Sequence, residues 1–297
     1  MKPSPTTFGA RSVFRAVFLV FCATLALSAT QRFASFDVPL PGVTDTEATA
    51  ITPSGTIVGR YFTPDGHTHG FRLVDGNFEF IDIPGAVTQT DITWVNARGD
   101  IVGSYDTPGQ THAYVLRHGH VTTIDYPGAT ITLGFGISNT GDVVGPEFTN
   151  DFFSAHGYLF RHGTFTLIDV PGAQATWPTM AIDSRRIVGA YFSPDQVFHG
   201  FLFRDGQFAT IDFPSSTFTW ITGINPEGHI VGFYFNSDGS DHGFVLKQGR
   251  YISIDIPGAT ATETNGIDPQ DDVVGRYVTP DGHTHGYFLL DPTKSKD

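Results

Sequence analysis

An all-β fold is predicted by three short phrases that recur six times along the 297-residue chain. The phrases are Ile-Asp-x-Pro-Gly-Ala, an apolar residue followed by Val-Gly, and His followed by Gly or Ala and an aromatic residue. They remain in phase at spacings of 42 to 45 residues, so each copy is expected to be one structural repeat. The composition agrees, because 34 Gly and 27 Phe against 2 Met favour many turns between aromatic-rich strands over a helical bundle.

Each repeat contains four strand-like runs, which the fifth repeat illustrates. Turns rich in Asn, Asp, Pro and Gly separate the runs Thr219–Ile224, His229–Phe235, His242–Lys247 and Tyr251–Ile256. The second run carries two adjacent apolar residues in every repeat, and these point to opposite faces, so both faces of each small sheet should be buried. Radially stacked sheets satisfy this pattern, whereas a β-helix lacks three hairpin turns per repeat and a sandwich of about 24 strands would be too large. The predicted fold is a six-bladed β-propeller of four-stranded blades.

The two ends of the chain are predicted to meet in one blade. The first strand, Phe33–Val38, corresponds to the fourth run of a repeat, and the last repeat ends after three runs at His285–Leu290. We expect the N-terminal strand to complete the last blade, which closes the ring and removes exposed sheet edges. The propeller domain should therefore cover residues 30–291, followed by a disordered tail over residues 292–297.

Residues 1–29 have the features of a signal peptide. Three basic residues precede an apolar run from Ala16 to Leu27, and the small residues Ser28 and Ala29 offer a cleavage site. The alternative is a membrane anchor, but the run is shorter than the roughly 20 residues a spanning helix needs. We expect a secreted protein, extracellular or periplasmic, that is free of the membrane after cleavage. Its one Cys, Cys22, would leave with the signal peptide, so the mature chain would have no disulfide.

The charge of the mature chain excludes one class of partner. Cleavage would leave 14 basic and 30 acidic residues and a net charge of −16, which disfavours nucleic acid and anionic membranes. We expect a monomer without a cofactor, whose partner is a small molecule, a glycan or a protein.

The recurring phrases resemble those of the bacterial HAF-type extracellular repeat family. The His-centred phrase occurs here as His69-Gly70-Phe71, His112-Ala113-Tyr114, His156-Gly157-Tyr158, His199-Gly200-Phe201, His242-Gly243-Phe244 and His285-Gly286-Tyr287. The resemblance covers nearly all of residues 33–290, and it implies export and a repeat architecture without a known activity. Small departures are the expanded Pro39–Gly42, Ser215-Ser216 in place of Gly-Ala, and Pro146 after Gly145.

The repeated His and Asp residues are expected to have a structural role. The Asp residues of the repeats are Asp37, Asp82, Asp125, Asp169, Asp212 and Asp255. A His–Asp pair can form part of a catalytic set, but a catalytic site occurs once and this pair recurs in every repeat. We expect each His to hydrogen-bond a carboxylate or a backbone carbonyl within its own blade or the next.

Two motifs with metal-ligand spacing are weak candidates. His67-Thr68-His69 and His283-Thr284-His285 each place two imidazoles on one side of a strand, but no extra carboxylate completes a site. Asn236–Asp241 resembles half of a calcium loop and lacks the distal Glu, so a simple turn is the better interpretation. We expect no metal.

Residues that break the repeat symmetry are the candidates for function. Glu47, Asp91 and Glu263 share one position just before the inner strand of three repeats, and Trp177, Phe218 and Trp220 precede the inner strands of two others. Trp94 and Phe135 lie slightly further in. If these residues lie on the loop-rich face and are exposed, the aromatic rings would bind a sugar or a protein, so we expect a non-enzymatic binding module. The alternatives are that the rings pack between blades, or that the carboxylates serve a hydrolase or lyase.

Overall fold

The computed structural model describes residues 33–149 and 154–293, and in these residues it contains β-strands and no α-helix. The strands are β1 (Phe33–Phe36), β2 (Asp45–Ile51), β3 (Ile57–Phe62), β4 (Thr68–Val74), β5 (Asn77–Ile81), β6 (Thr90–Val95), β7 (Ile101–Thr107), β8 (Gln110–Arg117), β9 (His120–Ile124), β10 (Ile131–Thr132), β11 (Gly136–Ile137), β12 (Val143–Phe148), β13 (His156–Arg161), β14 (Thr164–Leu167), β15 (Ala175–Asp183), β16 (Arg186–Phe192), β17 (Phe198–Arg204), β18 (Gln207–Ile211), β19 (Phe218–Ile224), β20 (Ile230–Phe235), β21 (Asp241–Lys247), β22 (Arg250–Ile254), β23 (Ala261–Ile267), β24 (Val273–Val278) and β25 (Thr284–Leu289). The predicted all-β class is confirmed, and the strands of the fifth repeat begin and end within two residues of the expected positions.

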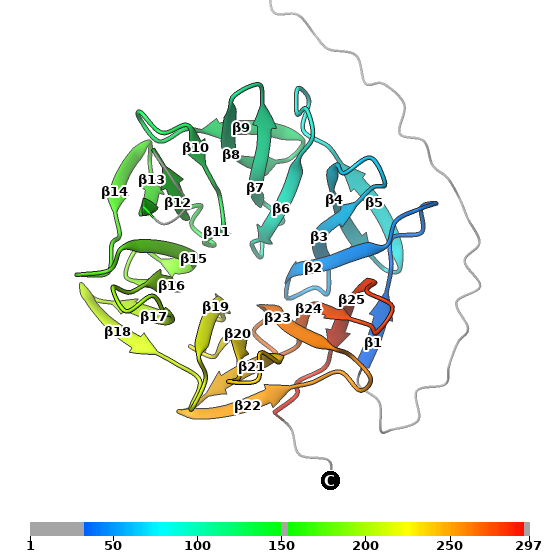
Figure 1. The fold of residues 1–297 in the computed structure, drawn as a ribbon. Helices are drawn as coiled ribbons and strands as arrows, with labels where there is room; N and C mark the ends of the chain where they lie inside the picture. The colour runs from blue at the N-terminus through cyan, green and yellow to red at the C-terminus, as the bar shows by residue number, and fades with distance from the viewer. Residues whose placement is uncertain (1–32, 150–153, 294–297) are drawn as a thin grey trace, which may run out of the picture. The chain divides into compact units, whose positions relative to one another are not determined.

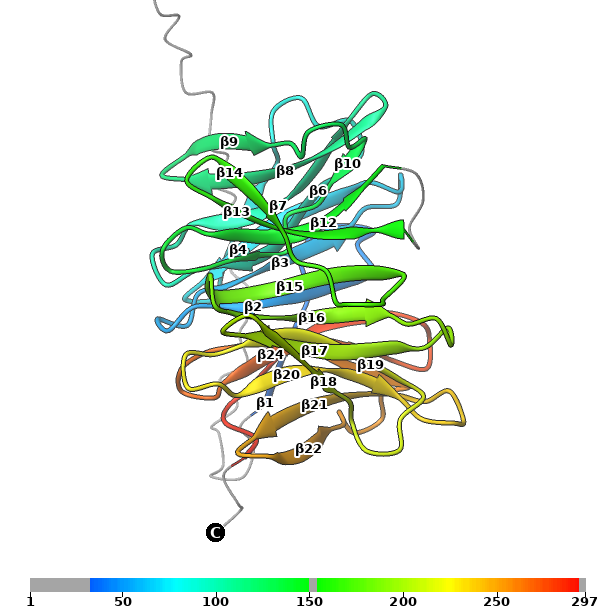
Figure 2. The same cartoon turned by 90° about the vertical axis from the view of Figure 1, so that its left-hand side faces the viewer.

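Consecutive strands pair antiparallel into units that match the repeats (Figure 1). Unit 1 is β2–β5, unit 2 is β6–β9, unit 3 is β10–β14, unit 4 is β15–β18, unit 5 is β19–β22, and unit 6 is β23–β25 together with β1. The first strand of each unit lies innermost in Figure 1, except in unit 3, where β11 does, and Figure 2 shows hairpin turns projecting at both ends of the strands. Some neighbouring units are bridged at single residues, such as Asp45 to Thr284, whereas unit 4 forms a sheet of its own.

The N-terminal strand pairs with the last strand of the chain, as expected. β1 lies antiparallel to β25, with Phe33 opposite Leu289 and Phe36 opposite Gly286. The strand ends at Phe36, two residues before the expected end. The expected tail needs correction at its start, because Lys247 Nζ donates a 2.9 Å hydrogen bond to Thr293 Oγ1.

The repeated Gly and aromatic residues fit together across each unit. Gly59 on β3 lies opposite Phe71 on β4, and Phe71 is fully buried. A Cβ at Gly59 would lie 2.7 Å from the Phe71 ring and 1.9 Å from the Glu47 carbonyl oxygen. Only glycine leaves room for the ring to lie flat on the neighbouring strand, so the two phrases are parts of one packing motif.

A bulge in the inner strands links neighbouring units. The skipped residue is Thr in four units and Asn in the last, and its side chain donates to a carbonyl oxygen of the next inner strand. These bonds run from Thr49 to Ile92 (2.9 Å), Thr93 to Gly134 (2.6 Å), Thr179 to Ile221 (2.9 Å), Thr222 to Thr264 (2.7 Å) and Asn265 to Ala48 (3.0 Å). The last bond joins the sixth unit to the first.

Unit 3 departs from the pattern because of its proline. Leu133 N donates to Pro146 O at 3.0 Å, and Pro146 has no N–H to return a bond. The inner strand is accordingly split into β10 and β11.

The expected signal peptide, residues 1–29, lies outside the described residues. In residues 33–149 and 154–293, no helix is long and apolar enough to cross a membrane.

Candidate functional site

The repeated His residues each contact the repeated Asp through Nδ1. The distances are 2.7 Å for His69–Asp82, 2.7 Å for His112–Asp125, 2.9 Å for His156–Asp169, 2.8 Å for His199–Asp212, 2.5 Å for His242–Asp255 and 2.8 Å for His285–Asp37. The last pair is separated by 248 residues and joins β25 to the segment after β1. This geometry agrees with the expected pairing inside each unit.

A tyrosine that sequence reasoning missed completes these pairs. In five units a Tyr ring stacks on the His ring, with centroids 5.1 to 5.2 Å apart. The tyrosines are Tyr61, Tyr105, Tyr191, Tyr234 and Tyr277. They stand two residues after the repeated Val-Gly, a signal that was visible in the sequence. Unit 3 has Glu147 opposite His156 at this place, and the His156 side chain is the most exposed of the six, at 55%.

The symmetry-breaking residues lie within the inner strands and not before them. Glu47, Asp91, Trp177, Trp220 and Glu263 share one register position, just before the residue that faces the repeated Gly. All five therefore lie at the end where the inner strands begin, which we call the mouth. Units 6, 1 and 2 present acids at this position, whereas units 4 and 5 present tryptophans.

The acids of the mouth hold two arginines in place. Arg60 Nε donates to Glu47 Oε2 at 2.7 Å, and Arg276 donates to Glu263 through two nitrogens and to Glu47 Oε1 at 3.2 Å. Arg60 also lies 3.5 Å from Asp91. The acid side chains are only 7 to 13% exposed, whereas those of Arg60 and Arg276 are 32% and 30% exposed, so both arginines remain partly accessible beside largely buried carboxylates.

Asp241 completes this acid–arginine cluster from the start of β21. Burial and the neighbouring Glu263 carboxylate raise the pKa of Asp241 to about 8, and Arg276 opposes that rise. One oxygen of Asp241 is buried and makes no hydrogen bond with the described residues. Glu47 and Glu263 are charge-paired, so neither has the unengaged carboxylate of a typical general base.

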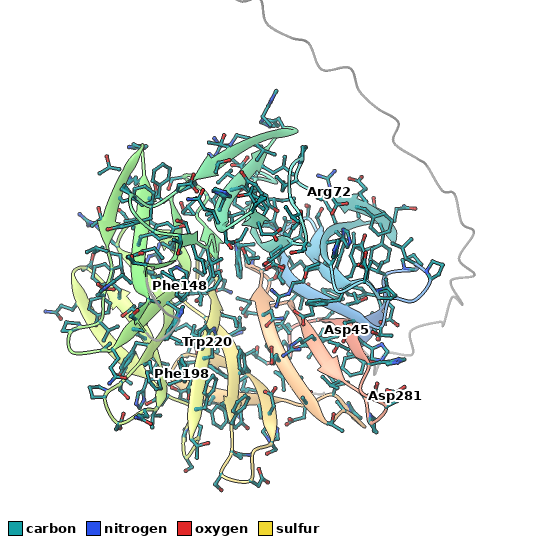
Figure 3. All side chains as sticks on the ribbon, turned by 45° about the horizontal axis from the view of Figure 1, so that its top comes forward. Asp45, Arg72, Phe148, Phe198, Trp220 and Asp281 are labelled. Atoms are coloured by element: carbon teal, nitrogen blue, oxygen red, sulfur yellow. The ribbon has the colours of Figure 1, made fainter. Side chains whose placement is uncertain are left out.

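On the other side of the mouth, four rings form an aromatic ladder across β19 and β20. Phe218 faces Phe235 and Trp220 faces Phe233, and the ring planes of these pairs differ by 16° and 20°. All four side chains are half-buried. Phe198 of unit 4 packs on the ladder, 5.2 Å from Phe218 and 5.7 Å from Trp220. In Figure 3, Phe148, Phe198 and Trp220 lie close together, whereas Asp45 and Asp281 lie on the opposite side.

Two tryptophans expected in an exposed patch are buried. Trp177 is fully buried with its ring 5.7 Å from Trp220, so it packs between units 4 and 5. Trp94 is 5% exposed, and its ring lies against Gly223 of unit 5 across the centre of the molecule. Glu47 is also buried, at 5% exposure. Phe135 is partly buried against the cluster that contains Trp177. The candidates that remain accessible are Phe218, Trp220, Asp91 and Glu263, all of which are half-buried.

The residues of the two motifs with metal-ligand spacing make hydrogen bonds within the protein. His69 and His285 bind carboxylates, and the segment Asn236–Asp241 forms a turn in which Asp238 accepts bonds from Ser240. In residues 33–149 and 154–293, no group of three or more His, Cys, Asp or Glu side chains is arranged to hold a metal ion.

Similarity to known proteins is confined to the fold. No protein-family model and no curated protein matches the chain. A mutant form of AofleA from Arthrobotrys oligospora is 14% identical, with a TM-score of 0.55 and coverage of 86% of each chain. The fold is that of a β-propeller. A fucose-recognising six-bladed lectin from Aleuria aurantia matches 87% of this chain and 99% of its own, at 11% identity and a TM-score of 0.52. A gluconolactonase from Xanthomonas campestris matches 84% of this chain and 88% of its own, at 11% identity and a TM-score of 0.50.

A lectin and a gluconolactonase share this propeller fold, so the fold alone does not decide between binding and catalysis. That decision depends on the side chains of the mouth.

Proposed function

We propose that the chain is an exported, six-bladed propeller that binds a carbohydrate at the mouth, with Phe218 and Trp220 as the stacking surface. The observation that carries this proposal is the occurrence of half-buried, nearly parallel rings and partly exposed arginine side chains around one mouth. A pyranose ring has an apolar face and a rim of hydroxyl groups, so it needs both kinds of surface from its binding site.

Six blades closed into a ring would give this mouth a rigid frame. Closure is supported by the pairing of β1 with β25, by the His285–Asp37 bond, and by the bond from Asn265 to Ala48. A site built on rigid strands holds its side chains in place before the ligand arrives, which lowers the entropic cost of binding.

The alternative is a hydrolase or lyase that uses the carboxylates of the mouth. It is favoured by one observation, the raised pKa of Asp241 beside Glu263, because a protonated and an ionised carboxyl can act as acid and base. It is opposed by the two-nitrogen contact of Arg276 with Glu263, which engages both oxygens of the prospective base.

Export and membership of the HAF-type repeat family are parts of the same proposal. The basic and apolar segment before residue 30 and the six His-centred phrases support them. Mass spectrometry of the protein from the producing cell should find a mature N-terminus near residue 30. An intact Met1 would contradict export through a cleaved signal peptide.

The experiment that tests binding is a glycan array probed with the purified mature chain, followed by calorimetry on the best ligand. We expect retention of a defined set of glycans, which are recovered uncut after long incubation. Recovery of shortened or unsaturated products would favour the enzyme alternative, and loss of those products in Glu263→Gln would assign them to the mouth.

A further inference from the structure

An open groove, which we call the rim cavity, borders the loop that leads from Asp82 to Thr90, just before Asp91 of the mouth. It has a volume of about 170 Å³ and lies between the start of β4 in unit 1 and the loop that leads into unit 2. Its lining includes the polar residues His67, His69 and Asp82 and the apolar residues Ile83, Ala86 and Val87. An engineered cavity of about 150 Å³ accommodates one benzene-sized ring, so this space suits a single six-membered ring.

The loop beside this rim cavity is held by a residue that breaks the repeat symmetry. Asp106 accepts hydrogen bonds from the backbone N–H groups of Val87, Thr88 and Gln89, at 3.2, 2.9 and 2.7 Å. Thr88 Oγ1 also donates to Asp106 Oδ2 at 2.6 Å. The corresponding residues of the other units are apolar: Phe62, Phe148, Phe192, Phe235 and Val278. Asp106 therefore anchors the loop that borders the rim cavity through bonds that an apolar residue cannot make.

His69 presents a hydrogen-bond acceptor to the cavity. Its Nδ1 must carry the proton, because the partner is the Asp82 carboxylate at 2.7 Å, so in the neutral ring Nε2 is an acceptor. Nε2 bonds loop hydroxyls in other units, as in His112 with Thr107 at 2.8 Å and His285 with Thr279 at 3.2 Å. Among the described residues, Nε2 of His69 makes no such bond. His67, 38% exposed, adds a second imidazole 6.4 Å away between ring centroids.

We propose that this rim cavity binds one ring of a neutral, hydroxylated ligand, namely a single monosaccharide unit. The imidazoles match hydroxyl groups, and the aliphatic side chains match the apolar face of the ring. No Lys or Arg lines the cavity, and Asp82 borders it, so an anionic ligand is disfavoured. The rim cavity shares no residue with the aromatic ladder of units 4 and 5, whereas Gln89 at its edge donates a hydrogen bond to Asp91 of the mouth.

The His67-Thr68-His69 motif has a matched copy that serves as an internal control. His283-Thr284-His285 has the same sequence, but the loop next to it is one residue longer. The bond from Val38 N to Thr46 Oγ1 in that loop spans eight residues, whereas the equivalent bond from Ile83 N to Thr90 Oγ1 at the rim cavity spans seven. Leu40 in that loop and Val87 at the cavity are both exposed, at 36% and 51%. Val87→Trp should fill the cavity, and Leu40→Trp adds the same bulk at the control rim.

The test is NMR of the mature chain labelled with ¹⁵N-histidine, titrated separately with D-glucose, D-galactose, D-mannose, L-fucose and N-acetyl-D-glucosamine. We expect at least one sugar to shift the His67 and His69 signals with a Kd near about 1 mM, while His283 and His285 stay unchanged. Val87→Trp should weaken that binding by about 10-fold or more, and Leu40→Trp should leave it unchanged. Tm measurements on both variants verify that they are folded.

Three outcomes would overturn the proposal: no shift with any sugar, equal shifts in both His pairs, or shifts that persist in Val87→Trp. A response to zinc chloride without any response to sugars would instead indicate a metal site. Because His67, His69 and Val87 lie outside the aromatic ladder of unit 5, a failure of sugar stacking on Phe218 and Trp220 would leave this result unaffected.

Discussion

The residues on the two sides of the mouth share one register position in their strands but have different structural roles. In units 6, 1 and 2 the position carries acids, of which Glu47 and Glu263 are paired with Arg60 and Arg276, and Asp91 lies 3.5 Å from Arg60. In units 4 and 5 it carries tryptophans, of which Trp177 is buried and Trp220 is half-buried. The repeat therefore fixes where a side chain lies, and its neighbours decide whether it stabilises the fold or faces a ligand.

Replacing Trp177 should have the largest effect on stability. Trp177→Ala removes a fully buried ring between units 4 and 5 and should lower the free energy of unfolding by about 3–5 kcal/mol. Urea denaturation measures this loss. A change below about 1 kcal/mol would mean that the ring is not part of the core, and would remove the contrast with Trp220.

On the charged side, Arg276→Gln should rank second. The change leaves Glu263 and Glu47 buried with one less cation, which should cost about 2–3 kcal/mol, because Arg276 is partly exposed. Arg72→Gln is the matched control, since the Arg72–Glu79 pair is exposed on both sides and should contribute less than about 1 kcal/mol. Equal losses in the two variants would show that the acid–arginine cluster contributes no more to the free energy of unfolding than an exposed ion pair does.

The pair that joins the chain ends should matter more than its copies. Asp37→Ala should cost about 1–2 kcal/mol and increase hydrogen exchange at β1 and β25, because β1 pairs only with β25. Asp82→Ala breaks an equivalent bond in unit 1, whose strands are joined by a hairpin, and should cost less. The reverse order would contradict the proposal that β1 closes the ring.

The charged side should also make stability depend on pH. Burial, together with Glu263, raises the pKa of Asp241 to about 8 in the folded state, far above its unfolded value of 3.8. The folded protein then binds more protons than the unfolded chain between about pH 4 and 8, so this group's contribution to stability falls as the pH rises through that window. Asp241→Asn, which mimics the protonated form, should make the stability profile flatter and raise stability near pH 8. An unchanged slope would show that Asp241 is ionised in the fold.

Much of the scaffold could be predicted from the period of the sequence. The His–Asp pairs, the strand order in each unit and the partner of β1 follow from residues that recur in phase, since equivalent residues in a repeat meet equivalent neighbours. The tyrosine that stacks on His was also readable, two residues after each Val-Gly except in unit 3.

The exposure of single residues could not be predicted in the same way. Trp177 and Trp220 share one register position, but whether each ring is covered depends on Phe198 and on the adjoining unit. Trp94 reaches Gly223 across the centre, a contact between units 2 and 5 that no local pattern indicates. Arg60 and Arg276 each follow the repeated Gly directly, and the other four units have no Arg at this position. Their ion pairs with Glu47 and Glu263 could not be predicted, because the strand register that places them opposite these acids was not known from the sequence.

Trp220 gives the most direct test of the proposed function, because its effect on stability should be the smallest of the series. Calorimetry with the best glycan from the array should compare the wild type with Trp220→Ala and with Phe80→Ala, an aromatic residue 44% exposed on the outer strand β5. The account predicts at least about 10-fold weaker binding in Trp220→Ala, a Tm within a few degrees of wild type, and no change in Phe80→Ala. Unchanged affinity in Trp220→Ala, or equal losses in both variants, would contradict a carbohydrate site at the mouth.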